Sequence, residues 1–541
     1  MYLKLEKDSS VVEDIEPPHA WTTTGDVEAW ISKSVQSLLG REIDVSGDLF
    51  QQGMDSLTSA MLLRILKSTL HSSNPHVRSA SININQQTIF DNPTVQQLAQ
   101  LLVRISKDDN PSVDPVADSL QAIKDMIQKY DSDWHRQEAH TTEPVKKERV
   151  VVTGTTGGLG SHLLAQLLES DKVEKVWAMN RKSSKGNTRE RQISSFDDKL
   201  LDTSLLKSEK LVFLDTDLEH PKLGLQDEMY NEIRTQATII IHNAWQVNFN
   251  LRLQSFEPSI LGARNLVDLA FGSSCASGFP RFVFTSSIAA VGSRGARRYL
   301  KEEPVGLEDG ATSMGYGQSK LVTEKILESA KRAGLETCII RLGQLTGDIK
   351  SGSWSTTDWV PSLIRSSLSV GCLPGAVGVV SWVPLDVAAH SIIETCVARE
   401  LELPLVVHVS HSRPVSWMDM LRAFSESIGS QTGSQLPIVY LDEWDKVVAE
   451  AAACFKGSEK DRYKQFPSVK IQNMVDGMVR ADKELRSHEN TSSAELGGHP
   501  RLDTTMAETR SQTLRTTPGL GAEHVQKWVG YWASRGLFRA A

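Results

Sequence analysis

The first hundred residues place apolar side chains at the spacing of α-helices. Apolar positions recur every three or four residues between Val27 and Leu39 and again between Leu57 and Leu66, so each stretch has one apolar face. A third such stretch follows residues 91–94 (Asp-Asn-Pro-Thr), a sequence typical of a helix cap and first turn. The pattern predicts a small all-α domain over residues 25–105, preceded by a polar tail or linker over residues 1–24.

A charged connector is predicted over residues 106–147. It contains three prolines, yet apolar side chains keep helical spacing between Val116 and Tyr130. Two interpretations stay open at this point: a helix packed on a neighbouring element, or a solvated linker.

From Arg149 onward the pattern becomes α/β. Short apolar runs typical of buried strands alternate with helical stretches; the runs are 150–152, 176–179, 211–214, 239–241, 282–284 and 338–340. This alternation predicts a Rossmann-type, doubly wound parallel sheet within a domain over residues 148–541. Beyond about residue 350 the mixed pattern predicts a smaller, largely helical C-terminal substrate lobe, and the polar stretch 485–512 predicts a loop.

Composition narrows the classes of protein that fit. A chain of 541 residues exceeds what one hydrophobic core usually serves, so we expect at least two domains. The net charge of -8 argues against nucleic-acid binding, which needs a basic face. Five cysteines without CxxC spacing argue against a disulfide framework or a metal site, and no apolar run is long enough to span a bilayer. We therefore expect a cytoplasmic protein without metal or membrane attachment.

A glycine turn between the first predicted strand and the following helix predicts a dinucleotide site. Gly154 allows the tight turn, Gly157 lets a pyrophosphate approach the backbone, and Gly160 lets helix and strand pack closely. We assign Thr156 and Leu159, which lie within the same turn, to the cofactor as well.

Cofactor choice is read at the end of the second strand. Enzymes that use NAD usually carry an acidic residue there, which binds the ribose hydroxyls. Here Arg181 and Lys182 occupy that place, and two cations are suited to a 2′-phosphate. The sequence therefore predicts NADPH; the alternative is a solvated surface pair.

A YxxxK motif supplies candidate catalytic residues. Tyr316 and Lys320 have the spacing that stacks both side chains on one face of a helix. A free tyrosine has a pKa of about 10, and a neighbouring ammonium lowers it, so Tyr316 is a candidate proton donor while Lys320 can also hold the nicotinamide ribose. Ser287 ends an earlier strand, where its hydroxyl can hydrogen-bond a substrate oxygen.

The order of glycine turn, strand-end serine and YxxxK resembles the extended short-chain dehydrogenase/reductases. That resemblance implies that Asp217 and Leu218 contact the adenine and that Asn243 and Ala244 shape the cofactor floor.

Four further motifs narrow the resemblance; they lie at residues 217–225, 242–245, 341–344 and 382–386. Together they are similar to thioester reductase domains at the C-termini of fungal adenylate-forming reductases, which resemble nonribosomal peptide synthetases. The resemblance implies NADPH-dependent release of a carrier-bound acyl thioester as an aldehyde in secondary metabolism, with Tyr316 and Ser287 stabilising the oxyanion. Relatives that lost the tyrosine catalyse a non-redox cyclisation, so Tyr316 favours reduction.

Ser56 stands at a loop-to-helix junction within the predicted all-α domain. Asp55 and Ser56 are both good helix-capping residues, so a simple N-cap is one interpretation. Residues 25–105, however, resemble acyl/peptidyl carrier proteins, which implies that a phosphopantetheinyl transferase esterifies Ser56 with 4′-phosphopantetheine. The positive end of a helix dipole suits such a phosphodiester.

The resemblance also bears on partners and alternatives. Related reductases carry an adenylation domain before the carrier, so either a separate adenylation enzyme or a polyketide or peptide synthase loads Ser56, or the sequence is a fragment. Two other functions stay open: an extended dehydrogenase or epimerase acting on a free small molecule, and a non-catalytic carrier scaffold. The residues do not identify the acyl group, the choice between aldehyde and alcohol, or the oligomeric state.

Overall fold

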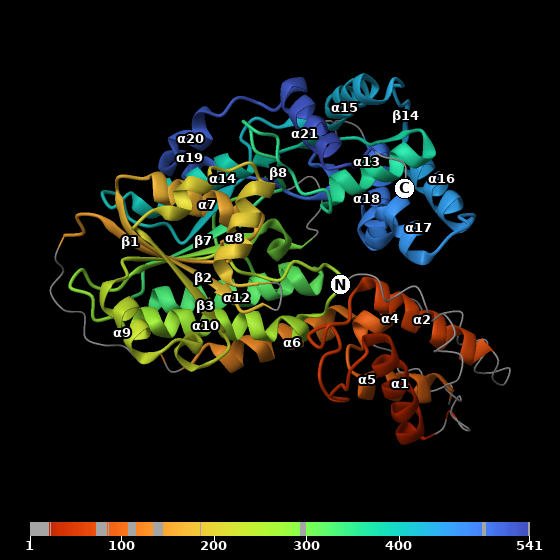
Figure 1. Ribbon diagram of the computed structural model, residues 1–541, viewed down its shortest axis with the longest axis horizontal. Coiled ribbons are helices and arrows are strands. Elements are labelled where there is room, and N and C mark those ends of the chain that lie inside the picture. The colour runs from red at the N-terminus through yellow and green to blue at the C-terminus, as the bar shows by residue number, and fades with distance from the viewer. Residues whose placement is uncertain are drawn as a thin grey trace. The chain divides into compact units, whose positions relative to one another are not determined.

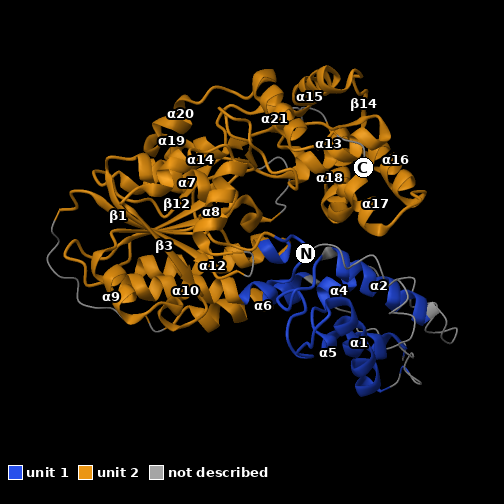
Figure 2. Ribbon diagram, in the orientation of Figure 1, with its two compact units in different colours: residues 1–119, 248–257, 314–316 blue, residues 120–247, 258–313, 317–541 orange. Residues whose placement is uncertain are grey.

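The computed structural model describes most of the chain and divides it into two compact units. The described residues are 21, 23–71, 84, 86–106, 115–132, 134, 144–183, 186–292, 299–488 and 494–538. Figure 2 shows one unit of residues 1–119, 248–257 and 314–316, and a second unit of residues 120–247, 258–313 and 317–541.

The helices of the first unit form where the apolar spacing predicts them. They are α1 (Thr24–Leu39), α2 (Ser56–His71), α4 (Gln86–Asp91) and α5 (Val95–Ser106). Apolar side chains of α1 and α5, such as Ile31 and Leu98, are fully buried. The rings of Phe50 and Phe90 stack with centroids 4.8 Å apart. The three predicted helices are therefore confirmed, and α4 is an additional short helix.

The connector holds a packed helix, α6 (Pro115–Tyr130). Ile123 on this helix is fully buried. At its end, Arg264 Nη1 donates to the carbonyl oxygens of Tyr130 and Ser132, each at 2.6 Å. For the described part of the connector, the packed helix is correct and the solvated linker is wrong.

A seven-stranded parallel sheet organises the second unit (Figure 1). Its order is β12-β7-β5-β4-β1-β2-β3. The strands are β1 (Glu148–Thr153), β2 (Val173–Arg181), β3 (Leu211–Thr216), β4 (Ile239–His242), β5 (Arg281–Ser287), β7 (Thr337–Leu342) and β12 (Val406–Val409). Six were predicted from apolar runs. The strand order reverses between β1 and β4, the switch point where such sheets bind ligands.

Helices cover both faces of the sheet, which confirms the doubly wound architecture (Figure 1). One core includes side chains of α7 (Gly158–Glu169) and α14 (Leu385–Val397). The opposite core includes side chains of α10 (Glu257–Phe271) and α12 (Gly315–Arg332).

The remaining elements are shorter or belong to the C-terminal lobe. The helices are α8 (Thr188–Asp198), α9 (Asp227–Gln236), α11 (Leu307–Ala311), α13 (Trp359–Val370), α15 (Trp417–Thr432), α16 (Leu441–Ala453), α17 (Glu459–Gln465), α18 (Gln472–Arg486), α19 (Thr505–Arg510), α20 (Gln512–Thr516) and α21 (Ala522–Ser534). The short strands are β6 (Tyr299–Leu300), β8 (Leu345–Thr346), β9 (Leu373–Gly375), β10 (Val379–Val380), β11 (Val383–Pro384), β13 (Val415–Ser416), β14 (Ile438–Tyr440) and β15 (Arg501–Leu502).

Tryptophan rings fill the core of the C-terminal lobe. The Trp354 ring lies 5.0 Å from that of Trp528, 5.3 Å from Trp532 and 5.9 Å from Trp382, measured between centroids. All four are nearly or fully buried. A smaller, largely helical lobe was predicted, and these tryptophans form part of its hydrophobic core.

Two expectations for the C-terminal region need correction. The chain beyond residue 350 does not stay in the lobe, because β12 and α14 return to the large sheet. The stretch 485–512 also contains β15 and α19, not only loop. Glu302 anchors this region by accepting hydrogen bonds from the amides of His408 at 2.9 Å and Ala507 at 3.0 Å, contacts between segments that lie far apart in the sequence.

Within the part of the chain that the structure describes, no helix combines the length and apolar character needed to cross a bilayer. Among the same residues, no group of three or more histidine, cysteine or acidic side chains is arranged to hold a metal ion.

Candidate cofactor and active site

In the glycine turn after β1, two of the three motif glycines leave no space for a side chain. Gly154 has a φ of +72°, and a Cβ there would lie 2.8 Å from the Ala244 Cα. A Cβ at Gly160 would lie 2.0 Å from the Gly154 carbonyl oxygen. At Gly157 the nearest atom to a Cβ would be 3.4 Å away, an ordinary contact. The turn therefore needs glycine for backbone packing at 154 and 160 and leaves room at 157.

Helix α7 begins directly behind this turn. Its N-cap is Gly157, and no side chain of the described residues caps the helix there. The first amides of a helix lack intrahelical partners and carry the positive end of the helix dipole. This arrangement fits the pyrophosphate of a dinucleotide.

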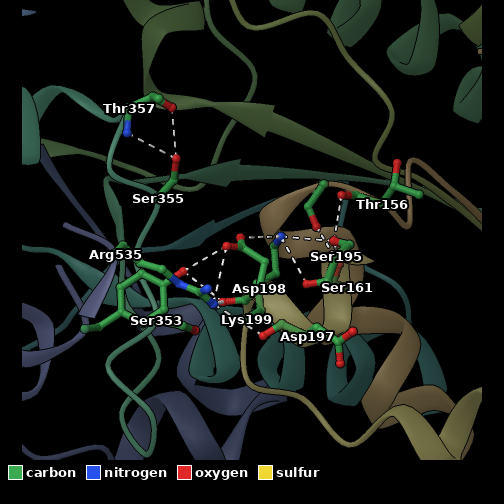
Figure 3. A network of polar contacts seen from close by, with 12 residues as sticks. Thr156, Ser161, Ser195, Asp197, Asp198, Lys199, Ser353, Ser355, Thr357 and Arg535 are labelled. Carbon is green, nitrogen blue, oxygen red and sulfur yellow. Dashed lines mark hydrogen bonds and ion pairs between the residues drawn. The ribbon is translucent and has the colours of Figure 1, made fainter. Parts of the chain in front are cut away.

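A chain of polar contacts from α7, α8 and the residue after α8 fixes the backbone of the glycine turn (Figure 3). The Ser161 hydroxyl donates to the carbonyl oxygen of Gly157 at 2.8 Å. The Ser195 hydroxyl donates to that of Thr156 at 2.9 Å, and Lys199 Nζ donates to Ser195 Oγ at 3.0 Å. Ser161 lies on α7, Ser195 lies on α8 and Lys199 directly follows α8, and none of them carries a sequence motif that would have identified it.

The chain of contacts continues to the last helix. The Tyr531 hydroxyl donates to the carbonyl oxygen of Asp198 at 2.8 Å, and Arg535 Nη2 donates to the same oxygen at 2.6 Å. Asp198 also pairs with Lys199 at 3.6 Å. The cofactor turn is thus braced by the C-terminal helix.

Thr153 at the end of β1 fixes the segment that we predict to form the cofactor floor. Its hydroxyl accepts hydrogen bonds from the amides of Asn243 at 3.0 Å and Ala244 at 2.9 Å, and it lies 3.0 Å from His242 Nδ1. Because the hydroxyl oxygen accepts both amides, its own proton points to Nδ1, which must then be unprotonated. Burial, with a further contribution from Lys320, lowers the His242 pKa to about 3, so this histidine is neutral. The structure brings Ala244 to the glycine turn, and a role of Asn243 and Ala244 in holding the cofactor stays a prediction.

The candidate adenosine residues follow the ends of β2 and β3. Arg181 and Thr216 are partners in the parallel register, so Asp217 and Leu218 follow at the same edge of the sheet as Lys182. The side chains of Arg181 and Lys182 are exposed. An exposed pair is accessible to a phosphate and is equally compatible with a solvated surface, so the NADPH assignment stays a prediction.

Two residues of the glycine turn differ in character. The Thr156 amide lies 3.3 Å from Asn180 Oδ1, which links the turn to β2. The Leu159 side chain is 7% exposed and packs in the core, so Leu159 can reach a cofactor only through its backbone.

Lys320 is held tightly beside β5. Its Nζ donates to the Thr285 carbonyl oxygen at 2.7 Å, two residues before Ser287, the last residue of the strand. The rings of Trp245 and Phe284 lie 4.2 Å and 4.5 Å from the ammonium. Burial lowers the Lys320 pKa well below its usual range, and the Glu324 carboxylate opposes that shift.

Tyr316 lies in the first turn of α12, one turn before Lys320. Its ring is 8% exposed and makes edge contacts with Phe249 at 5.2 Å and Phe256 at 6.1 Å. Tyr316 and Ser287 fall in different compact units, so their pairing at one carbonyl stays a prediction.

Gly317, inside the YxxxK motif, lets the start of α12 pack closely on Ala289, two residues beyond the end of β5. A Cβ there would lie 2.0 Å from Ser313 Oγ and 2.2 Å from the Ala289 carbonyl oxygen. The Ser287 hydroxyl accepts from the Ala289 amide at 3.2 Å. The same short segment therefore orients Ser287 and packs against the start of α12, a role that sequence reasoning missed.

At the start of α2, Asp55 is the capping residue. Its Oδ1 accepts from the amides of Leu57 at 3.0 Å and Thr58 at 2.8 Å. Helix α2 begins at Ser56, whose side chain lies outside the described part of the structure. Since the Asp55 carboxylate accepts hydrogen bonds from both of these amides, the helix cap does not need the Ser56 hydroxyl.

Comparisons with known proteins assign both regions of the chain. A family model described as a phosphopantetheine attachment site matches residues 29–102, and an NAD-binding family described as male sterility protein matches residues 152–392. An adenylate-forming reductase of Serpula lacrymans is 36% identical over 99% of this chain and 49% of its own length. The chain thus joins a region similar to phosphopantetheine carriers to a region similar to an NAD-binding family, and it is similar over nearly its whole length to adenylate-forming reductases. We call the two regions together the didomain. The didomain spans about half the length of the curated relatives it matches.

Other comparisons agree with this assignment. A carboxylic acid reductase of Neurospora crassa is 29% identical to the didomain over 92% of this chain and 45% of its own length. Among solved structures, the terminal R domain of the myxalamid PKS-NRPS pathway covers 78% of the didomain and 99% of its own chain, with a TM-score of 0.63 and 20% identity. A thiolation-reductase di-domain of an archaeal non-ribosomal peptide synthetase covers 95% and 98%, with a TM-score of 0.60 and 18% identity. These structures establish the fold.

The two matched families also identify the cofactors in general terms. They support NAD(P)H for the reductase region and phosphopantetheine for the carrier region. A phosphopantetheine carrier implies a thioester substrate and modification by a phosphopantetheinyl transferase.

Proposed function

We propose that the didomain uses NADPH to reduce an acyl thioester held on the phosphopantetheine of Ser56 and releases the acyl group as an aldehyde. The observation that carries this proposal is the alignment of three neighbouring strands. The glycine turn ends β1, Asn243 and Ala244 follow β4, and Ser287 ends β5. Because the strands are parallel, a nicotinamide site and the candidate catalytic serine share one edge of the sheet.

Each protein group has a defined task in this proposal. NADPH, when bound, supplies the hydride, and the phosphopantetheine arm presents the thioester. Ser287 and Tyr316 hydrogen-bond the substrate carbonyl oxygen, where negative charge develops as the hydride arrives. Tyr316 donates its proton to that oxygen, which gives a hemithioacetal, and the Lys320 ammonium favours the phenolate that is left. The hemithioacetal then loses its hydroxyl proton as the carbon–sulfur bond breaks, which releases the aldehyde and the protonated pantetheine thiol.

The preference for NADPH rests on Arg181 and Lys182 at the end of β2. A guanidinium can grip a phosphate with two parallel charge-assisted hydrogen bonds, whereas lysine adds a point charge. We assign the 2′-phosphate to this pair and the adenine to Asp217 and Leu218.

Loading of the carrier is assigned to another protein or region, either an adenylation enzyme or a polyketide or peptide synthase. We also place the didomain in the cytoplasm. All five cysteines are unpaired and four are buried, which supports a reducing compartment.

The proposed function is tested by the variant Tyr316→Phe. We expect it to retain the fold and NADPH binding but to lose roughly 10²–10⁴-fold in the rate of thioester reduction, the usual contribution of a positioned general acid. Rates are followed by NADPH consumption and aldehyde trapping on the phosphopantetheinylated chain. A loss below about tenfold, with chemistry limiting, would assign the proton donor elsewhere. Wild-type protein that reduces only a free small molecule would favour the extended dehydrogenase or epimerase.

A further inference from the structure

A fully buried ion pair lies one helical turn beyond Lys320 on α12. Glu324 of α12 and Arg341 of β7 are both 0% exposed. Arg341 Nη2 donates to Glu324 Oε2 at 2.7 Å, and Arg341 Nε lies 3.1 Å and 3.2 Å from the two carboxylate oxygens. The remaining guanidinium nitrogen, Nη1, donates to the Glu303 carbonyl oxygen at 2.9 Å.

The pair joins three elements of the active site. The Ser286 hydroxyl donates to Glu324 Oε1 at 2.5 Å. Ser286 immediately precedes Ser287 on β5 and is the register partner of Arg341 on β7. Glu324 stands four residues after Lys320 on α12, the spacing that places two side chains on the same helix face. One carboxylate thus connects the helix of Lys320 to the strand of Ser287.

Stability alone does not account for this arrangement. Removing two charges from water costs several kcal/mol per ion, and well-packed apolar side chains of similar volume are often as stabilising as a buried ion pair. The position of the carboxylate next to Lys320 suggests a use for its charge.

We infer that Glu324 is a positioning residue for the reduction, whose carboxylate, fixed by Arg341 and Ser286, keeps Lys320 charged and in place beside Ser287. This inference rests on the function proposed above and names a residue of the same site. Glu324 does not touch the reacting atoms; it acts through Lys320.

The charged groups around Lys320 determine the direction in which its pKa changes when Glu324 is replaced. On its own helix Lys320 has the Glu324 carboxylate, which opposes the effect of burial, and β4 contributes His242, whose pKa Lys320 helps to lower. His242 is neutral because burial lowers its pKa to about 3. Removal of the Glu324 carboxylate takes away a charge that favours protonated Lys320 and leaves the Arg341 cation without its counter-charge. The Lys320 pKa then falls further, and Lys320 loses its proton at a lower pH.

The test compares Glu324→Gln with Glu148→Gln in the phosphopantetheinylated chain. Glu148 is a matched control: Arg399 binds its two oxygens at 2.9 Å and 3.0 Å, it is buried, and it starts β1 at the opposite edge of the sheet. We expect both variants to lose thermal stability. Only Glu324→Gln should lower kcat by about tenfold or more, a part of the general-acid contribution, and move the alkaline limb of the pH–kcat profile to lower pH.

A conservative variant and a milder one keep the test decisive. Glu324→Asp retains the charge and should restore the alkaline limb of the wild type. Ser286→Ala removes one hydrogen bond to Glu324 and should move the alkaline limb of the pH–kcat profile in the same direction by a smaller amount. This variant replaces Glu324→Gln in the test if Glu324→Gln does not fold. If pH profiles of the folded variants at Glu324 and Ser286 superimpose on the wild type, the inference is wrong although the proposed function stands. If the wild type reduces no tethered thioester, the proposed function itself fails.

Discussion

Helices α2 and α7 both begin where we assign a phosphate, but their first turns differ. At α2 the Asp55 carboxylate accepts the amides of Leu57 and Thr58. At α7 the N-cap is Gly157, and no described side chain caps the helix. One helix start has its amides satisfied by the protein, and the other leaves them available for a ligand.

The difference corresponds to how each phosphate is held. A phosphodiester attached through a serine oxygen needs no binding energy from helix amides, so a carboxylate cap next to it is tolerated. A dinucleotide held without a covalent bond needs those amides, and a carboxylate at the same place would repel it. A helix start can therefore carry a covalently attached phosphate or bind a free one. A carboxylate cap is compatible with the first use only, and an uncapped start is needed for the second.

The largest expected effect comes from Ser56→Ala. It should abolish the mass gain produced by a phosphopantetheinyl transferase and stop turnover of tethered substrate, because the attachment oxygen is gone. NADPH binding should be unchanged, since that site uses other residues. Intact-protein mass spectrometry and cofactor titration check both points. Normal turnover of tethered substrate would show that Ser56 does not carry the acyl group.

Gly160→Ala tests the open helix start. The new Cβ would lie 2.0 Å from the Gly154 carbonyl oxygen, so the turn must shift. Overpacking typically lowers the free energy of unfolding by about 1–3 kcal/mol. Loss of one hydrogen bond to the charged pyrophosphate, worth roughly 1.5–3 kcal/mol, predicts about ten- to hundredfold weaker NADPH binding. Gly158→Ala is the control, because its Cβ meets only Leu385 at 3.8 Å. Equal affinities for the two variants would remove the turn from the cofactor site.

Arg181→Ala tests whether the cofactor carries a 2′-phosphate. One hydrogen bond to a charged group contributes roughly 1.5–3 kcal/mol, which corresponds to about ten- to hundredfold in affinity. Because Arg181 is exposed, we expect the lower end of this range. The KM for NADPH should rise and that for NADH should stay nearly constant, with a weaker effect for Lys182→Ala. Equal wild-type efficiency with both cofactors would overturn the assignment.

The smallest expected effect distinguishes the two residues at the start of α2. Asp55→Ala should reduce the free energy of unfolding of the carrier region by about 1 kcal/mol, the usual contribution of an N-cap. Ser56→Ala should leave it unchanged, because Asp55 makes both capping hydrogen bonds. Thermal unfolding of the full chain with each variant measures the difference. The reverse result would make Ser56 the cap.

Local sequence patterns predicted the parts of the fold that depend on local spacing. Apolar runs located six strands of the large sheet, and helical periodicity located α1, α2 and α5. Strand β12 was missed because His408 interrupts its apolar run and the strand follows a long excursion into the lobe. His408 is nevertheless fully buried, where its Nδ1 lies 2.8 Å from the Asp503 carbonyl oxygen.

The candidate site shows the same division. Residues in motifs, such as Lys320 and Asn243, lie where their spacing predicts. The supporting residues Ser195, Lys199 and Glu324 carry no motif, because their partners are brought near by the fold and not by the sequence. Polar side chains of this kind are found only when the hydrogen bonds themselves are known.

The tryptophan core of the C-terminal lobe has a spectroscopic consequence. The indole rings of Trp382, Trp528 and Trp532 each lie 5.0–5.9 Å from that of Trp354. Transition dipoles this close and this rigidly oriented couple as excitons, and they give near-ultraviolet circular dichroism that depends on their mutual angles. The near-ultraviolet circular dichroism of the didomain therefore reports the packing of its C-terminal lobe without any added label.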